Sequence, residues 1–415
     1  MADATQANVA AEATFRETAA APARGFLRDR SDEDSARVSF VELFYDLVFV
    51  FAVTQLAAYL AENLTPEGLV RGAVLFFAVW WLWITTAWAT NRLDPDRNLV
   101  RVVIFALMGG GLMFSAAIPK AFDDRGLVFA LAYVAMQLLR SLFLVWALLH
   151  HEETSQARTF ERVSVWFAVS GCLWIGGAIA ESDVRILLWS LALVVDVTVP
   201  WVGYWVPGMG RSSAREWDIE GEHLAERCGL FMIIALGESL LVTGARLADA
   251  EWDAPILLSF GVALLAALAM WWLYFDLGHR RGALAFERSK EPGRLARFAY
   301  TYVQMPIVAG IVLTAVGDKL LLDYPEEPSG WTEALVLLGG PALFLLGNYL
   351  FKNATHRRWP VSHLAGMALM ALPLPWLGAF STFSLSAYST AVLIAVALLE
   401  GFLLRSREAA RAGLN

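Results

Sequence analysis

The strongest constraint on this chain is a succession of long apolar segments separated by short polar connections. A helix of about 20 residues rises about 30 Å, which matches the hydrocarbon core of a bilayer, so each segment is long enough to cross a membrane. Hydrophobic residues make up 58% of the chain and charged residues 17%, a balance that a water-soluble fold could not bury. The sequence therefore predicts an all-α, polytopic transmembrane helical bundle with about twelve spans: 39–61, 68–90, 98–118, 127–149, 161–181, 184–206, 225–247, 254–276, 297–317, 331–351, 361–380 and 383–404.

The distribution of lysine and arginine predicts how these spans are oriented. The N-terminal tail, the even-numbered connections and the C-terminal end together hold 25 basic residues, whereas the odd-numbered connections hold 6 and Arg140 lies within a span. Because basic connections stay on the cytoplasmic side, we expect both termini in the cytoplasm. Residues 1–37 contain no apolar targeting segment, and their mixed charge predicts a disordered cytoplasmic tail.

Matches between the two halves of the chain predict an internal duplication. Trp80-Trp81-Leu82-Trp83 in span 2 resembles Trp271-Trp272-Leu273-Tyr274 in span 8, and Glu42 and Glu226 open spans 1 and 7. A basic connection that contains proline follows span 2 and again follows span 8, at a similar offset. We therefore predict two parallel six-span repeats, 38–206 and 207–405, followed by a cytoplasmic C-terminal end at 406–415. Transporters with parallel repeats often carry their ligand or ion path between the halves.

Charged side chains inside the spans are the sharpest functional signal in this sequence. A central Asp, Lys or Arg costs about 2.5–3.5 kcal/mol on membrane insertion, so such a group needs a partner or a water-filled cavity. Several polar residues of the spans are candidates for one polar path through the bundle. They are Glu42, Asp46, Gln55, Arg140, Asp196 and Glu238.

Two hypotheses follow from the positions of these candidates. Asp46 and Arg140 lie at comparable depths on antiparallel spans, so we hypothesise that they form a buried ion pair, either as part of a mechanism or as a structural lock between two helices. Glu238 follows Gly237 near the middle of span 7 and is the best candidate for binding a proton or a cation. The alternative for Glu238 is a protonated carboxyl that hydrogen-bonds to a neighbouring helix.

Signals for other kinds of function are weak. His150-His151-Glu152-Glu153 places neighbouring side chains on different sides of a helix, and the other histidines have no ligand spacing, so we expect no metal site. Cys172 and Cys228 lie in apolar runs and indicate no disulfide framework. Because the sequence also lacks a phosphate loop and a nucleophile elbow, we expect no cofactor, no enzymatic activity and no nucleic-acid partner.

Two segments resemble the signatures of the bacterial low temperature requirement A (LtrA) family. The segment from Glu42 to Leu56 is similar to E-L-F-F-D-L-V-F-V-F-x-x-T-Q-L, with Tyr45 in place of the usual phenylalanine. The segment from Glu226 to Ser239 is similar to E-R-x-G-L-F-x-I-I-x-L-G-E-S. The resemblance covers about residues 38–405, and it implies a multi-pass protein of the bacterial plasma (inner) membrane that is linked to growth at low temperature.

Three functions are compatible with these observations. The first is a transporter or ion-conducting protein that moves a small solute or a cation along the carboxylate-lined path. The second is a non-transporting membrane protein that scaffolds partners or adapts the bilayer to cold, and the third is an intramembrane enzyme that modifies lipid with carboxylates as acid and base. The first is favoured because it accounts for both the duplication and the buried carboxylates. In each case the lipid bilayer is the main partner, and the residues leave the oligomeric state open.

Overall fold

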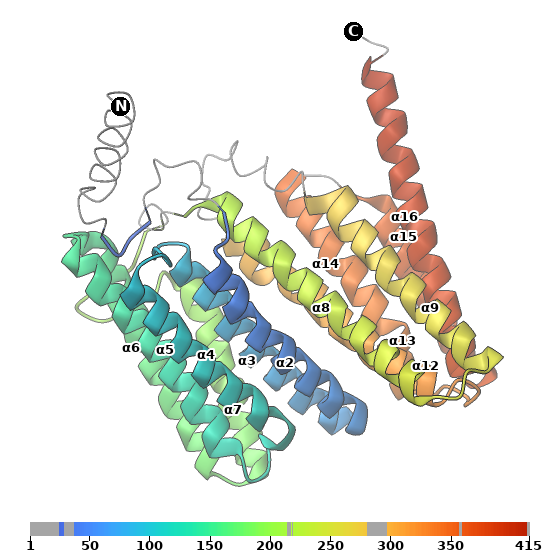
Figure 1. Ribbon diagram of the computed structural model, residues 1–415, viewed down its shortest axis with the longest axis horizontal. Helices are drawn as coiled ribbons and strands as arrows, with labels where there is room; N and C mark the ends of the chain where they lie inside the picture. Colours follow the sequence, from blue (N-terminus) through green and yellow to red (C-terminus); the bar gives the residue numbers. More distant parts are fainter. Residues whose placement is uncertain are drawn as a thin grey trace, which may run out of the picture.

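The computed structural model describes residues 25–28, 37–213, 217, 219–279, 297–356 and 359–412, which form helices and no β-strand (Figure 1). The α-helices are α2 (Phe40–Glu62), α3 (Pro66–Thr90), α4 (Asn98–Ala117), α5 (Gly126–His150), α6 (Thr154–Ile179), α7 (Ser182–Thr198), α8 (Gly221–Asp249), α9 (Ala254–Trp271), α12 (Gln304–Asp323), α13 (Trp331–Leu337), α14 (Gly339–His356), α15 (Val361–Ala371) and α16 (Thr382–Ala412). Short 3₁₀-helices are η2 (Ile118–Lys120), η3 (Val199–Val202) and η7 (Leu374–Ala379), and π-helical segments are η5 (Trp272–His279) and η6 (Arg297–Tyr302).

Eleven helical segments of the described chain are long and apolar enough to cross a membrane. Each of the eleven overlaps one of the predicted spans, and the exception among the predicted spans is 361–380. The prediction of a polytopic transmembrane helical bundle is therefore confirmed. The protein is a multi-pass membrane protein.

The prediction of one continuous helix over 361–380 is wrong. Helix α15 has only 11 residues, which give a rise of about 17 Å. Pro373 lacks the backbone N–H that would continue the hydrogen bonding of α15, so α15 ends and the chain continues in η7.

The broken segment nevertheless runs along the whole span formed by α13 and α14. Near the end of α14, Lys352 contacts His363 in the first turn of α15. At the opposite end, Pro328 before α13 pairs with Ser381, which directly precedes α16. The segment from α15 to η7 therefore covers the path that the sequence predicted for a single helix.

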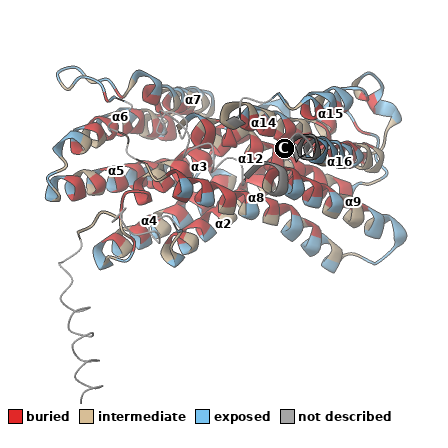
Figure 2. Cartoon of the chain, turned by 90° about the horizontal axis from the view of Figure 1, so that it is seen from above, coloured by how far each residue is buried: buried red, intermediate tan, exposed pale blue. Residues whose placement is uncertain are grey.

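The helices form two groups that meet along a central contact. Helices α2–α7 make one group and α8–α16 the other, and α2, α3, α8 and α12 lie near the middle of the molecule (Figures 1 and 2). Helix α2 packs against α3 and α4, and α8 correspondingly packs against α9 and α12. Across the groups, α2 contacts both α8 and α12. A duplication would produce such matched neighbours, and the internal repeat stays a prediction.

Residues 25–28 lie against the bundle, although the sequence assigned them to a disordered tail. The Arg28 N–H donates to the Arg92 carbonyl (2.9 Å), and the Phe26 N–H donates to Nε2 of His151 (2.8 Å). This short segment brings the Arg28 side chain to the start of α2. Residues 1–24 and 29–36 of the predicted tail are outside the described residues.

Candidate functional site

A network of buried charges joins α2 to α8. Glu42 accepts a hydrogen bond from Arg28 (2.7 Å) and another from Arg227 of α8 (3.0 Å), and it lies 3.0 Å from Nε2 of His223. Glu42 also closes a capping box with Ser39, which fixes its position in the first turn of α2. Glu42, His223 and Arg227 are fully buried.

Asp46 lies one helical turn further along α2 and binds the same arginine. Its Oδ1 accepts hydrogen bonds from Arg227 (2.7 Å) and from Nε1 of Trp83 in α3 (2.8 Å), while its Oδ2 has no hydrogen-bond partner in the described part of the chain. Arg227 therefore bridges the two carboxylates that the sequence placed on one helix face. We call Arg28, Glu42, Asp46, His223 and Arg227 the charge network.

The hypothesis of an ion pair between Asp46 and Arg140 is wrong. Arg140 donates to Oγ1 of Thr86 (2.9 Å) and to Oε1 of Gln137, and Asp46 binds Arg227 instead. Similar depth and opposite charge are necessary for a pair but do not choose between two arginines. Helix α8 lies against α2 and supplies the nearer one.

Arg140 is connected to Asp196 through intervening side chains. Nε2 of Gln137 donates to the Tyr133 hydroxyl (3.2 Å), which donates to Oδ2 of Asp196 (3.0 Å). The Asp196 side chain is buried in α7. Two of the predicted candidates therefore belong to one hydrogen-bonded chain within the first group of helices.

Glu238 lies in the middle third of α8 and has a hydroxyl as its partner. Oγ1 of Thr54 in α2 donates to Glu238, and the next residue, Ser239, donates to Oδ2 of Asp318 in α12 (2.5 Å). Glu238 and Asp318 are buried, and no ion pair to either one occurs among the described residues. Thr54 rather than Gln55 donates to Glu238, and the side chain of Gln55 is half-buried. We call Glu238 and Asp318 the carboxylate pair.

The charge network and the carboxylate pair lie at two levels of one contact between parallel helices. Glu42 meets Arg227 near the start of α2 and α8, and Thr54 meets Glu238 further along both. Twelve residues separate Glu42 from Thr54, which corresponds to about 18 Å along a helix. The α2–α8 contact thus carries acidic groups over more than half of the bilayer thickness.

Among the buried cations that sequence reasoning missed, Arg227 and Lys352 are the least exposed. Arg227 and Lys352 were counted as basic residues of cytoplasmic connections, yet they are 0% and 4% exposed. Lys352 binds both oxygens of Glu400 at 2.7 Å, beside His363. A usable signal for Arg227 was its spacing from His223, because residues four apart share a helix face. A count of charges per connection discards that information.

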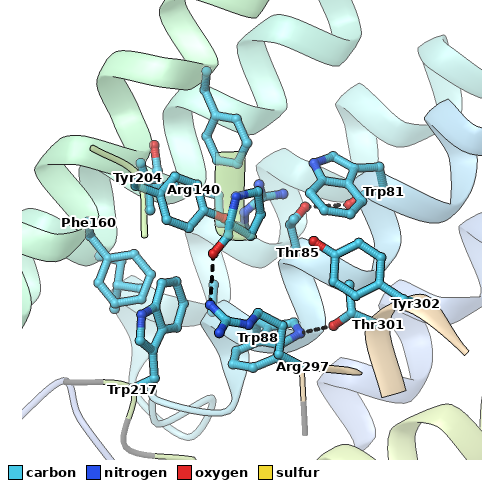
Figure 3. Close-up of a pocket in the computed structure, with 16 residues that line it drawn as sticks. Trp81, Thr85, Trp88, Arg140, Phe160, Tyr204, Trp217, Arg297, Thr301 and Tyr302 are labelled. Carbon is cyan, nitrogen blue, oxygen red and sulfur yellow. Dashed lines mark hydrogen bonds between the residues drawn. The ribbon is translucent and has the colours of Figure 1, made fainter. Parts of the chain in front are cut away.

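A pocket lies between the two groups of helices (Figure 3). It holds about 560 Å³ of empty space, including the open volume at its mouth. Aromatic rings from α3 and α6, together with Tyr204, Trp217 and Tyr302, form much of its wall. Arg140 and Arg297 also line it, and none of its described lining residues is acidic.

Tyr204 has an unusual conformation in this wall. Its φ of 49° is in the left-handed region, which an aromatic residue rarely adopts. Burial raises the pKa of the Tyr204 phenol well above its usual range, so the hydroxyl is neutral at physiological pH. The strained position is typical of residues held in place at functional sites.

Within the described residues, no cluster of three or more His, Cys, Asp or Glu side chains could hold a metal ion. Glu42 and Asp46 also have their charges balanced by arginine.

Comparisons with known proteins identify relatives over nearly the whole chain. A family model described as bacterial low temperature requirement A protein (LtrA) matches residues 37–398. An uncharacterized protein of Rhizobium meliloti (strain 1021) is 41% identical over 374 residues, which cover 89% of this chain and 90% of the relative. No solved structure matches the chain. The matched range includes the charge network except Arg28, and it includes the carboxylate pair.

Proposed function

This chain belongs to the bacterial low temperature requirement A family, and from that premise we propose that it is a secondary transporter whose solute movement is coupled to protons or another cation. The coupling ion binds the carboxylate pair, and the solute moves between the two groups of helices. The proposal treats the chain as a transporter and not as an enzyme.

The observation that carries this proposal is the isolation of Glu238. Its carboxyl is buried at mid-helix with a hydroxyl as its partner, and the described residues include no cation bonded to it. An ionised carboxylate in such a place would be very costly, whereas a protonated carboxyl is tolerated. A group of this kind can take up a proton and release it when its surroundings become wet. Asp318, which accepts a hydrogen bond from Ser239, the residue adjacent to Glu238, is a second buried carboxyl that can hold a proton.

The charge network supports the proposal in a different way. Its ion pairs connect α2 in one group of helices with α8 in the other, and they lie at the end where both helices begin. A motion of the groups against each other can pivot where they are held by strong bonds and open where they are not. In transporters with parallel repeats, alternating access arises from such rocking of one half against the other.

Membrane and orientation follow from the basic residues and from the family. We place the chain in the bacterial inner membrane with both termini in the cytoplasm, because the basic connections alternate strongly in favour of that side. The charge network is then near the cytoplasmic face, and the carboxylate pair is nearer the periplasm. Loss of this transport in the cold would account for the link to growth at low temperature that the family name expresses.

Proton flux in proteoliposomes tests the proposal. Purified protein is reconstituted with a pH-sensitive dye inside the vesicles, and a potassium diffusion potential drives protons inward. We expect wild-type protein to acidify the lumen, Glu238→Gln to slow this at least tenfold, and Glu222→Gln to behave like wild type. Glu222 is a matched control because it is an exposed glutamate of the same helix. Equal flux in wild type and Glu238→Gln would remove Glu238 from the mechanism.

A membrane scaffold is the second candidate function, and the complete pairing of Glu42 favours it. A carboxylate that three basic side chains surround stabilises a junction and does not need to move. A scaffold would show no proton flux above that of protein-free vesicles. Its loss would nevertheless slow growth in the cold, and the Glu238→Gln variant would fully restore that growth.

A further inference from the structure

The pocket between the helix groups is lined mainly by aromatic rings, and its charged groups in the described chain are all positive. Trp81 and Trp88 of α3, Phe160 and Phe167 of α6, and Tyr302 of η6 contribute rings to it. Arg140 and Arg297 are its charged groups among the described lining residues. Such a site offers an apolar body a large contact area and offers an anion two guanidinium groups.

The two arginines have different local environments. Arg140 is 3% exposed and is held by Thr86 and Gln137, and its guanidinium lies over the Phe167 ring at 5.5 Å. Arg297 is half-buried at the start of η6, and its guanidinium donates to the Pro200 carbonyl at 2.9 Å (Figure 3).

Arg297 therefore keeps donors for a ligand. A guanidinium carries five N–H donors in a planar fork, and the Pro200 carbonyl takes one of them. No ion pair to Arg297 or to Arg140 occurs among the described residues. The neutral Tyr204 hydroxyl lies in the same wall and can donate as well.

We propose that this pocket binds an amphipathic organic monoanion, with the acidic head on Arg297 and Arg140 and an aromatic or alkyl body among the tryptophans. The assignment rests on the proposed transport function in so far as the bound anion is the transported solute.

The location of the pocket gives the bound anion a way to influence the two groups of helices. Trp81, Trp88 and Arg140 belong to the first group, whereas Arg297 and Tyr302 belong to the second. Two hydrogen bonds already connect the groups here, from Trp80 and Trp88 to Thr301. A ligand that contacts both groups favours the arrangement in which they are close, which is the differential affinity that a population shift requires.

Calorimetric titration of the full chain in nanodiscs tests the site. The probes are 2-naphthoate, the neutral isostere 2-naphthylmethanol, and inorganic sulfate, with empty nanodiscs as the blank for partition into lipid. We expect 2-naphthoate to bind at least tenfold more tightly than 2-naphthylmethanol, because a charge-assisted hydrogen bond is lost with the carboxylate. We expect sulfate to bind weakly because it has no apolar body. Equal binding of the two naphthyl probes, or no binding of either, would overturn the proposal.

Variants assign the charge recognition to particular residues. Arg297→Gln and Arg140→Gln should each weaken 2-naphthoate binding about tenfold. Arg101→Gln is the matched control, since Arg101 begins the corresponding span of the first predicted repeat and pairs with Asp96 at the surface. The comparison of probes on wild-type protein needs no variant, so a folding defect of Arg140→Gln leaves the test intact. An equal effect of Arg101→Gln and Arg297→Gln would overturn the assignment.

The composition of the nanodisc separates a dissolved anion from an anionic lipid. The titration is carried out in phosphatidylcholine alone and again with phosphatidylglycerol added. Binding of 2-naphthoate that persists with phosphatidylglycerol supports a dissolved ligand, whereas its loss would overturn that choice in favour of a lipid headgroup. Binding without proton flux would contradict the proposed transport function but support the anion site. Proton flux without binding would support the transport function and contradict the anion site.

Discussion

The α2–α8 contact carries buried carboxylates at two levels, and the two levels are built on opposite principles. At the first, Glu42 and Asp46 share Arg227, with Arg28 and His223 beside them. At the second, Glu238 has the Thr54 hydroxyl as its partner. The first level is balanced in charge and bonds the two groups of helices together. The second level has no balancing cation among the described residues. Glu238 can therefore remain buried away from water only while its carboxyl is protonated. One contact thus combines a fixed junction with a group that can change its charge.

The largest expected effect comes from removing the shared cation. Arg227→Leu leaves two carboxylates buried without their arginine, and breaking a buried pair in this way costs about 3–5 kcal/mol. We expect a large drop in the melting temperature of the detergent-solubilised protein, measured by tryptophan fluorescence. Arg246→Leu, which breaks an exposed pair with Asp323, should change stability by about 1 kcal/mol or less.

A neutralised triple variant sharpens this first prediction. Glu42→Gln and Asp46→Asn, added to Arg227→Leu, remove every charge that the arginine held. Most of the lost stability should return, because the triple variant no longer buries two carboxylates without their arginine. No recovery would mean that Arg227 stabilises the junction through packing against Trp83 rather than through charge.

The next largest effect is expected from Asp46→Asn alone. Asparagine keeps the oxygen that accepts from Trp83 but loses the charge that faces Arg227, and a hydrogen bond to a charged group contributes about 1.5–3 kcal/mol. The same melting experiment measures the loss. Arg140→Gln combined with Asp46→Asn should give additive losses, since the two residues belong to separate hydrogen-bonded chains. If the loss in the double variant differs strongly from the sum of the two single losses, Asp46 and Arg140 interact, which would contradict the structure.

A smaller effect is expected from Thr54→Val at the second level. This change removes the hydroxyl that donates to Glu238 and preserves the shape of the side chain. If Glu238 is a neutral carboxyl, the loss should be about 0.5–1.5 kcal/mol, the usual contribution of a hydrogen bond between uncharged groups. Thr198→Val is the control because the Thr198 hydroxyl bonds within its own helix at an exposed position. A loss as large as that of Asp46→Asn would indicate an ionised Glu238 and would contradict the comparison.

The sequence was sufficient for the architecture and for part of this site. Apolar length and basic connections predicted the spans, because those properties are set by the bilayer and do not depend on tertiary contacts. The cost of burying charge likewise selected Glu42, Asp46 and Glu238, which the structure places along one helix contact. The broken helix at Pro373 was missed because hydropathy averages over a window and does not register the end of a helix.

The partners of these carboxylates could not be predicted from the sequence in the same way. Choosing Arg227 over Arg140 for Asp46 requires knowing that α8 packs on α2, and that contact joins segments 181 residues apart. Asp318 was overlooked because the predicted span 297–317 ends one residue before it, whereas the helical span of the structure continues to Asp323. The pocket depends on side chains from six separate segments, so only the folded arrangement reveals that its charges have one sign.

The smallest change in stability is expected from Glu238→Gln, and it separates the two levels most clearly. Glutamine can still accept the Thr54 hydrogen bond, and no cation is left unpaired by the substitution among the described residues. The loss should therefore be about 1 kcal/mol or less, well below that of Asp46→Asn, although both changes replace a carboxyl by an amide. The melting temperatures of the two variants, measured side by side in one detergent, provide the test. Equal losses would mean that Glu238 is as structural as Asp46, and the unbalanced level would then be a second junction rather than the group that changes its charge.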